Sequence, residues 1–238
     1  VTNAQFKEFV DATGYVTFAE KPLSKNVFPK APPDQLLPGA TVFAPPPDNI
    51  NPRIANDPWN WWLYRKGACW RRPEGRNSSI KSRMDHPVVC VNIDDAKAYA
   101  KWAGKRLPTE AEWEYLGRGN RGGHRFVWGE RPAEACRESN VFDQSAKRAR
   151  PDRRIDAAPC DDGFAEVAPV GSLAANPFGV HDILGNVWEW VEDCYVMPLP
   201  PSAPRDGSAQ LAEGCDRRGS RGGSWLSSFS RQTPTFRG

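Results

Sequence analysis

The sequence lacks several features on which common catalytic sites depend. Only three histidines are present, His86, His124 and His181, and they share no metal-ligand spacing, so a histidine-based metal centre is not expected. No C-x-x-C pair occurs, which argues against a zinc site and a thioredoxin-like redox motif. The segment Gly222-Gly223-Ser224 has no second flanking glycine, so the nucleophile elbow of α/β-hydrolases is missing as well.

Charge and hydropathy exclude two further classes of partner. The chain carries 32 basic and 29 acidic residues, a formal net charge of +3, which is too small to steer it to nucleic acid. No segment approaches the roughly 18 to 20 apolar residues that cross a bilayer. No signal peptide is present, and the sequence starts abruptly at Val1 inside a helix-opening motif, so we expect that a leader has been trimmed.

The composition indicates a loop-rich globular protein with large aromatic anchors. The 238 residues include 10 tryptophans, 20 glycines and 23 prolines, and a chain of this length buries a core of its own. No tandem repeat and no clear linker divides it. We therefore predict a single domain over residues 1–238.

Three helices are predicted from capping residues that precede apolar residues at helical spacing. Their N-caps are Thr2, Asn92 or Asp94, and Thr109, and glycines 14, 104 and 117 are expected to end them. After Asn120 no stretch has a sustained helical period, so short strands and turns are expected there. The best strand candidates are Val187–Val191 and Gly222–Trp225.

The segment Phe18–Pro58 is predicted to be a long wrapping loop, because its many prolines remove the backbone donors that a central strand or helix needs. An aromatic cluster follows at Trp59, Trp61, Trp62, Tyr64 and Trp70. A carbohydrate or peptide platform is one interpretation of this cluster, but burial against the wrapping loop explains it more simply.

The six dispersed cysteines are consistent with disulfides. Cys136 and Cys160 flank one loop and Cys194 and Cys215 another, so two local disulfides are hypothesised, although six cysteines allow about fifteen connectivities. Cys69 and Cys90 are then either free thiols or a third disulfide. Disulfides indicate an oxidising compartment, a periplasm or the extracellular space.

Two oxygen-rich sequences are candidate calcium sites, because Ca²⁺ prefers carboxylate, amide and backbone oxygens. One combines Asn140 with the turn Asp161-Asp162-Gly163, and the other combines the run Asp182–Asn186 with Glu189. Neither matches an EF-hand loop. On composition alone, surface turns with local side-chain hydrogen bonds explain both better.

Five segments, in this order along nearly the whole chain, resemble the formylglycine-generating enzyme (sulfatase-modifying factor) family. They are Val1–Phe6, His86–Val89, Trp102–Tyr115, Gly185–Trp190 and Arg221–Trp225. The resemblance implies an α+β fold related to C-type lectins, with little regular secondary structure and with structural calcium. It also implies a missing C-terminal tail, because the chain stops at Gly238 before the Gly-Phe-Arg segment usual in the family.

The resemblance assigns calcium ligands residue by residue and reverses the compositional preference for plain turns. The first site falls on Asn140, Val141, Asp162 and Phe164, some of them through backbone carbonyls. The second falls on Asp182, Gly185, Val187 and Glu189. Asp182 replaces the usual asparagine of the family and still supplies an oxygen ligand.

The main departure from the family lies after Trp225. Two cysteines that bind copper and the substrate thiol are expected there, but this sequence has Ser227 and Gln232. A serine hydroxyl is neither a soft copper(I) ligand nor a disulfide partner. Copper is therefore not predicted, and conversion of a sulfatase cysteine to formylglycine should be lost.

The resemblance therefore implies a periplasmic or secreted protein of the PvdO-like branch, acting in oxidative maturation of a peptide-derived metabolite such as the pyoverdine siderophore chromophore. Trp188, Ser224, Ser227 and Arg231 are the candidate catalytic residues, and Arg231 is a candidate partner for a substrate carboxylate. The alternative is a non-catalytic binding module of the same fold. Sulfatase cysteine oxidation by another route is a weaker alternative.

Overall fold

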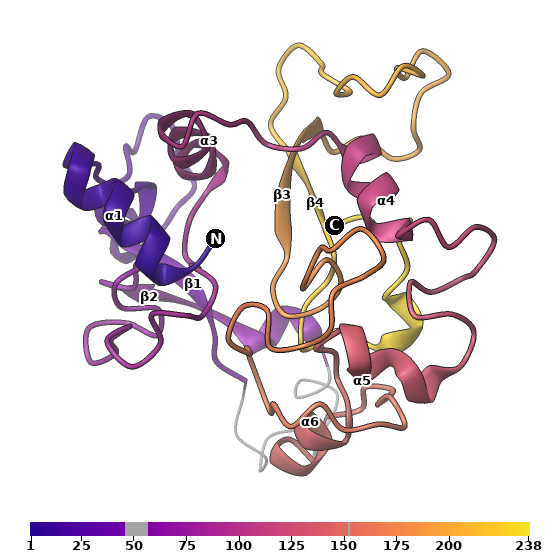
Figure 1. Cartoon of the computed structure of the whole chain (residues 1–238). Coiled ribbons are helices and arrows are strands. Elements are labelled where there is room, and N and C mark those ends of the chain that lie inside the picture. The colour runs from indigo at the N-terminus through magenta and orange to yellow at the C-terminus, as the bar shows by residue number, and fades with distance from the viewer. Residues whose placement is uncertain (46–56, 152) are drawn as a thin grey trace. The chain divides into compact units, whose positions relative to one another are not determined.

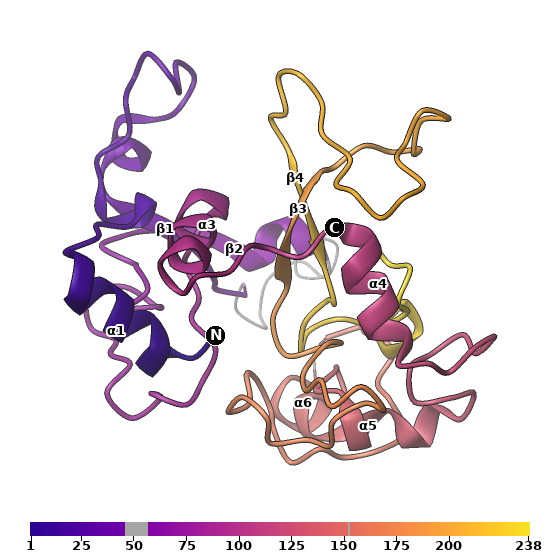
Figure 2. The same cartoon turned by 45° about the horizontal axis from the view of Figure 1, so that its top comes forward.

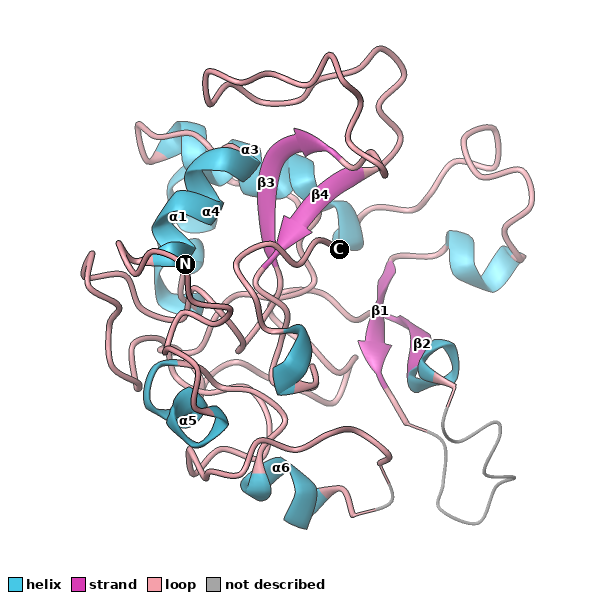
Figure 3. Ribbon diagram, turned by 90° about the vertical axis from the view of Figure 1, so that its right-hand side faces the viewer, coloured by secondary structure: helices cyan, strands magenta, loops and turns pink. Residues whose placement is uncertain are grey.

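The structure is a computed structural model that describes residues 1–45, 57–151 and 153–238 (Figure 1). It contains two compact units, Val1–Lys105 and Arg106–Gly238. Loops and turns make up most of each unit, with short helices and two-stranded sheets between them (Figure 3). The predicted α+β fold with little regular structure is confirmed, whereas the prediction of a single domain stays a prediction. No helix within the described ranges is long and apolar enough to cross a membrane.

In residues 1–45 and 57–105, the first unit contains two α-helices, an antiparallel strand pair and several 3-10 helices. In chain order these are α1 (Asn3–Thr13), the 3-10 helices Phe18–Glu20 and Pro33–Leu36, β1 (Gly39–Phe43), the 3-10 helix Pro58–Trp61, β2 (Trp62–Lys66) and α3 (Ile93–Trp102). Both α-helices begin at a predicted cap, Thr2 or Asn92, with a complete capping box. α1 ends at Gly14, whose φ of 66° is left-handed as predicted.

The wrapping-loop prediction for Phe18–Pro58 is partly wrong, because β1 lies inside it. Residues 39–43 contain no proline, so they keep the backbone donors that pair with β2 from Gly39↔Lys66 to Phe43↔Trp62. The part of this prediction that concerns residues 46–56 lies outside the described part of the chain.

Burial explains only some of the aromatic cluster. Trp70 is fully buried and Trp61 is 6% exposed, which confirms core packing for these two. The ring of Phe6 lies 5.2 Å from that of Trp70 and 5.8 Å from that of Tyr99, so α1 and α3 share an aromatic core. Trp62, however, is 50% exposed on β2. The side chain of Trp59 lies outside the described part of the structure.

The second unit is built around α4 and the β3–β4 pair. Its elements are α4 (Glu110–Arg118), the 3-10 helix Pro132–Glu134, α5 (Ala135–Glu138), α6 (Gln144–Ala149), β3 (Glu189–Cys194), β4 (Arg218–Arg221) and the 3-10 helix Phe229–Arg231. α4 starts at the predicted Thr109–Glu112 capping box. It ends at Gly119 rather than Gly117, because Gly117 is helical and packs closely on the ring of Trp113.

Two further expectations for this unit need correction. β3 begins two residues later than Val187, and the predicted strand Gly222–Trp225 is a turn, since Gly222 and Gly223 have φ values of 95° and 70°. The strand instead lies before them, with Glu189 opposite Arg221 in β4. The four-residue α5 and six-residue α6 are too short to show a helical period.

Both hypothesised disulfides are present, Cys136–Cys160 and Cys194–Cys215. The second closes the base of the long loop between β3 and β4, which projects beyond the strands in Figure 2. Cys69 and Cys90 are free thiols, so the third disulfide is not formed. Burial raises the pKa of Cys90 to about 12, so this thiol stays protonated at neutral pH.

Candidate functional site

The turn after β4 and the 3-10 helix that follows it carry Ser227 and Gln232, where the resemblance implies a cysteine pair. Gly222 and Gly223 both adopt positive φ, which favours glycine. A Cβ on Gly223 would lie 2.6 Å from the side-chain amide of Gln232. The two glycines therefore let the backbone turn sharply and pack directly against Gln232.

Ser224, Ser227 and Gln232 form one hydrogen-bonded group in this turn. The Ser224 amide donates to Ser227 Oγ at 3.1 Å, and the two hydroxyl oxygens are 3.5 Å apart. Gln232 Nε2 donates to the Ser224 carbonyl at 3.2 Å. Gln232 is 1% exposed, and its Oε1 has no partner among the described residues. Hydroxyl and amide oxygens are hard donors, so this set does not fit copper(I).

Backbone hydrogen bonds attach the turn to two other segments of the unit. The carbonyl of Gly222 accepts from the Gly185 amide at 2.8 Å, and the Trp225 amide donates to the carbonyl of Asn186 at 3.0 Å. The Ser227 carbonyl accepts from the Phe142 amide at 3.1 Å. The turn is thus held by the same two segments that contain the candidate calcium ligands.

Only two of the four predicted catalytic residues are brought together, Ser224 and Ser227. Trp188 is 37% exposed and packs on Phe236 with ring centroids 5.5 Å apart. Arg231 ends the 3-10 helix next to Gln232 with an exposed side chain. No hydrogen bond joins Trp188 or Arg231 to the two serines within the described ranges.

Two buried side-chain oxygens distinguish the first candidate calcium group. Asn140 Oδ1 and Asp162 Oδ2 are both buried without a hydrogen-bond partner among the described residues. Their other side-chain atoms are used, since Asn140 Nδ2 donates to the Glu166 carbonyl at 2.8 Å and Asp162 Oδ1 accepts from the Phe164 amide at 2.7 Å. These contacts place the segment 162–166 beside Asn140 and orient both side chains.

The electrostatics of this group also favour a cation. Burial raises the pKa of Asp162 to about 7, and the neighbouring carboxylate of Asp143 adds to this shift. Asp143 itself is fully buried, and its Oδ2 accepts from the Asp162 amide at 2.6 Å. Two carboxylates held this close repel each other, and a bound cation would relieve that repulsion, so the residues fit Ca²⁺.

In the second candidate calcium group, each carboxylate already accepts a hydrogen bond. Asp182 Oδ2 accepts from the Gly171 amide at 2.7 Å, and Glu189 Oε2 accepts from the indole of Trp113 at 2.6 Å. Burial raises the pKa of Glu189 to about 7. The remaining oxygens, Asp182 Oδ1 and Glu189 Oε1, form no hydrogen bond with the described residues. Gly185 lies against Asn140 of the first group in a parallel bridge.

Neither group depends on a cluster of acidic ligands. No set of three or more His, Cys, Asp or Glu side chains that could hold a metal occurs among residues 1–45, 57–151 and 153–238. Backbone carbonyl oxygens would have to complete the coordination of calcium, from Val141, Phe164, Gly185 and Val187. Neither group is therefore recognisable as a cluster of acidic side chains.

A buried ion-pair network behind the turn was missed in the sequence. Arg221 is 1% exposed, and its guanidinium contacts Glu110 and Glu114 of α4, each at 3.1 Å. It also donates to the carbonyls of Pro234 and Thr235 and lies 5.2 Å from the centre of the Trp113 ring. Arg221 opens the motif Arg221–Trp225, which was the one signal that pointed to it.

Comparison with known proteins identifies the family of this arrangement. The family described as "Sulfatase-modifying factor enzyme 1-like domain" matches residues 1–238. The chain is 43% identical over 219 residues to the formylglycine-generating enzyme of Mycobacterium tuberculosis, covering 91% of this chain and 70% of that protein. It is 40% identical over 234 residues to that of Streptomyces coelicolor, covering 95% and 65%.

The chain is also similar to a relative named as inactive and to a solved structure. The inactive C-alpha-formylglycine-generating enzyme 2 of Bos taurus is 35% identical over 196 residues, 82% of this chain and 58% of that protein. The chain thus spans less than two thirds of the bovine and Streptomyces proteins. PvdO from Pseudomonas aeruginosa shares the fold, with a TM-score of 0.59 and 24% identity over 100% of this chain and 70% of PvdO. The predicted resemblance to the family is confirmed.

Proposed function

The chain belongs to the sulfatase-modifying factor enzyme 1-like family, and on that premise we propose that it recognises a peptide or peptide-derived molecule without the cysteine-pair chemistry of formylglycine synthesis. The observation that carries this proposal is the hydrogen-bonded group of Ser224, Ser227 and Gln232. The hydroxyl and amide groups in this group bind by hydrogen bonds, and none of them is a thiol. The four cysteines of this unit are all in disulfides.

Two further exposed side chains of this unit are expected to contribute contacts to a peptide. Trp188 offers a partly exposed aromatic face, and Arg231 an exposed guanidinium for a carboxylate. Similarity to a protein named as an inactive formylglycine-generating enzyme is consistent with recognition without that reaction. The two disulfides support an oxidising compartment, periplasmic or extracellular.

Peptide recognition is tested by fluorescence anisotropy with a labelled, cysteine-containing sulfatase-type peptide that ends in a free carboxylate. We expect binding, and we expect Arg231→Gln to weaken it by roughly tenfold, because a charge-assisted hydrogen bond contributes about 1.5–3 kcal/mol. Arg205→Gln is the matched control, since Arg205 is also an exposed arginine of this unit. An equal loss in both variants, or no binding at all, contradicts peptide recognition at this turn.

The second candidate function is PvdO-like oxidative maturation of a peptide-derived chromophore. It is favoured by a fold shared with PvdO along the entire chain. To separate the two candidate functions, the protein is incubated in air with the sulfatase-type peptide or with the dihydro precursor of the pyoverdine chromophore. Mass spectrometry then measures any change in the mass of each substrate. Unchanged masses support recognition alone, loss of two hydrogens from the precursor supports oxidation, and formylglycine in the peptide contradicts both.

Structural calcium is part of the same proposal, with Asn140, Val141, Asp162 and Phe164 as the first set of ligands. Adding Ca²⁺ after chelation should raise the free energy of unfolding, by about 2.7 kcal/mol at a hundredfold excess over Kd. Asp162→Asn should weaken Ca²⁺ binding roughly tenfold or more, whereas Asp156→Asn, at an exposed aspartate nearby in sequence, should not. Thermal unfolding with and without Ca²⁺ measures both effects, and equal melting temperatures would remove this part of the proposal.

A further inference from the structure

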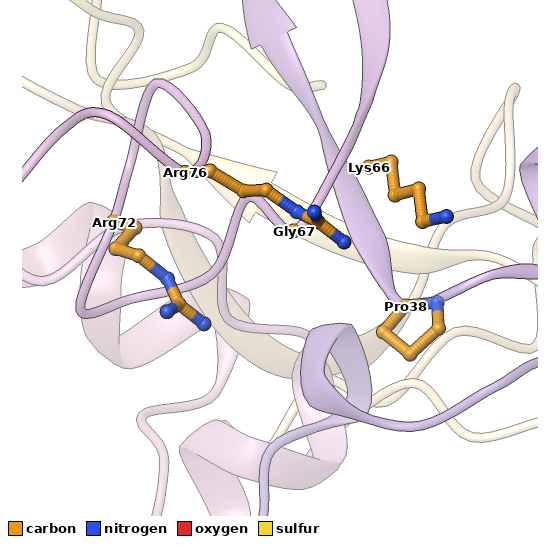
Figure 4. A pocket seen from close by; sticks show the side chains of 5 residues that line it. All are labelled: Pro38, Lys66, Gly67, Arg72 and Arg76. Carbon is orange, nitrogen blue, oxygen red and sulfur yellow. The ribbon is translucent and has the colours of Figure 1, made fainter.

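The first unit contains a cavity lined by basic side chains that none of the functions above uses. Its volume is about 440 Å³, and Pro38, Lys66, Gly67, Arg72 and Arg76 line it (Figure 4). This size falls within the range of roughly 300–1,000 Å³ that is typical of small-molecule sites. Three cations therefore surround a space large enough for a ligand.

These three exposed cations form no ion pair with the described residues, whereas two nearby arginines do. Arg83 forms a two-point ion pair with Glu74 at 2.6 and 2.9 Å, and Arg71 lies 4.0 Å from Glu20. By contrast, the side chains of Lys66, Arg72 and Arg76 form no ion pair or hydrogen bond with any residue that the structure describes. The carboxylate of Glu74, which lies between the two arginines in sequence, is occupied by Arg83.

The walls of the cavity are ordered by short backbone hydrogen bonds. The Gly67 amide donates to the Pro38 carbonyl at 2.8 Å, which joins the end of β2 to the segment before β1. Arg72 exchanges backbone hydrogen bonds with Cys69 at 2.8 and 3.1 Å. A Cβ on Gly67 would lie 2.8 Å from Cγ of Arg76, so the stem of Arg76 packs directly over that glycine. The bases of the three side chains are thus fixed around one space.

We infer that this cavity binds a small, multiply charged oxyanion, with Lys66, Arg72 and Arg76 as its ligands. Each guanidinium presents a planar fork that matches two oxygens of a phosphate or carboxylate, and the lysine adds a point charge. Three like charges around one cavity repel one another, and a polyanion would remove that repulsion. The inference is independent of the proposed peptide recognition, because it uses residues of the first unit alone.

Isothermal titration calorimetry with pyrophosphate and with citrate tests the inference on the whole chain. The two probes distinguish a phosphoryl ligand from a tricarboxylate. The triple variant Lys66→Gln, Arg72→Gln, Arg76→Gln should bind the preferred probe on the order of 100-fold more weakly, since a hydrogen bond to a charged group contributes about 1.5–3 kcal/mol. The control triple variant Lys81→Gln, Lys101→Gln, Lys105→Gln removes three exposed charges of the same unit and should bind like the unmodified chain.

Each outcome of the titrations either supports or overturns oxyanion binding in the cavity. Binding that is lost in the cavity variant and kept in the control supports the site, and the stronger probe identifies its ligand class. Equal weakening in both triple variants would show attraction to net charge alone, and absence of heat with both probes at two temperatures would show that the cavity does not bind oxyanions. Either result overturns the inference, while peptide binding at the Ser224 turn would remain to be judged separately.

Discussion

Replacing Arg221 by methionine is expected to lower the free energy of unfolding by about 2–4 kcal/mol, because it removes a buried cation that contacts two carboxylates and two backbone carbonyls. Glu110 would keep its ion pair with Arg237 and Glu114 its ion pair with Arg118, so each carboxylate would lose one of two cations. The carbonyls of Pro234 and Thr235 would also lose their donor. Urea unfolding of the purified variant measures the loss, with Ca²⁺ held constant.

Arg217→Met is the matched control for this change. Arg217 lies four residues earlier and is exposed, and no side-chain contact ties it to the described residues. Its replacement should change the unfolding free energy by less than about 0.5 kcal/mol, as surface substitutions usually do. Similar losses in both variants would mean that the network around Arg221 does not hold α4 to the strands.

Replacing Gly185 by alanine should cost about 3 kcal/mol or more, because two penalties combine at this residue. Its φ of 84° is unfavourable for any side chain. A Cβ there would also lie 2.0 Å from the Asn140 carbonyl oxygen, which is backbone and cannot swing away. The bridge between Gly185 and Asn140 would have to open, so the variant should lose Ca²⁺-dependent stabilisation as well as stability in urea.

Gly179→Ala separates the two penalties. Gly179 has a similar φ of 77°, but nothing lies within 4 Å of the position where its Cβ would be. This variant should lose only the conformational part, about 1–2 kcal/mol. If the two alanine variants unfold at the same urea concentration, the close approach of Gly185 to Asn140 does not contribute to stability.

Local signals in the sequence predicted the parts of the fold that depend on neighbouring residues. Thr2, Asn92 and Thr109 each begin a helix, because a capping side chain acts on backbone amides within the same turn. The end of α4 was misplaced because Gly117 is held in the helix by its packing on Trp113, while Gly119 has the left-handed conformation. Both glycines looked equivalent in the sequence.

The candidate site divides in the same way. The substitution of Ser227 and Gln232 for the cysteine pair is visible in the sequence, and it was sufficient to argue against thiol chemistry. The sequence does not predict the contacts of these side chains, because Gln232 donates a hydrogen bond to the carbonyl of Ser224, eight residues earlier. Phe236, which packs on Trp188, was likewise not anticipated, because nothing in its local sequence indicates that contact.

The sequence by itself determined the family, the starts of α1, α3 and α4 and the loss of the thiol pair, because each is carried by residue identity or by short-range spacing. It gave the two disulfides only as a hypothesis among about fifteen connectivities. Only the tertiary structure decided that Arg221 is buried between two glutamates, that Asn140 and Asp162 present unpartnered oxygens, and that Lys66, Arg72 and Arg76 surround one cavity. Those features depend on contacts between segments far apart in the chain. Such contacts form only when the backbone has turned at glycines such as Gly67, Gly185 and Gly222.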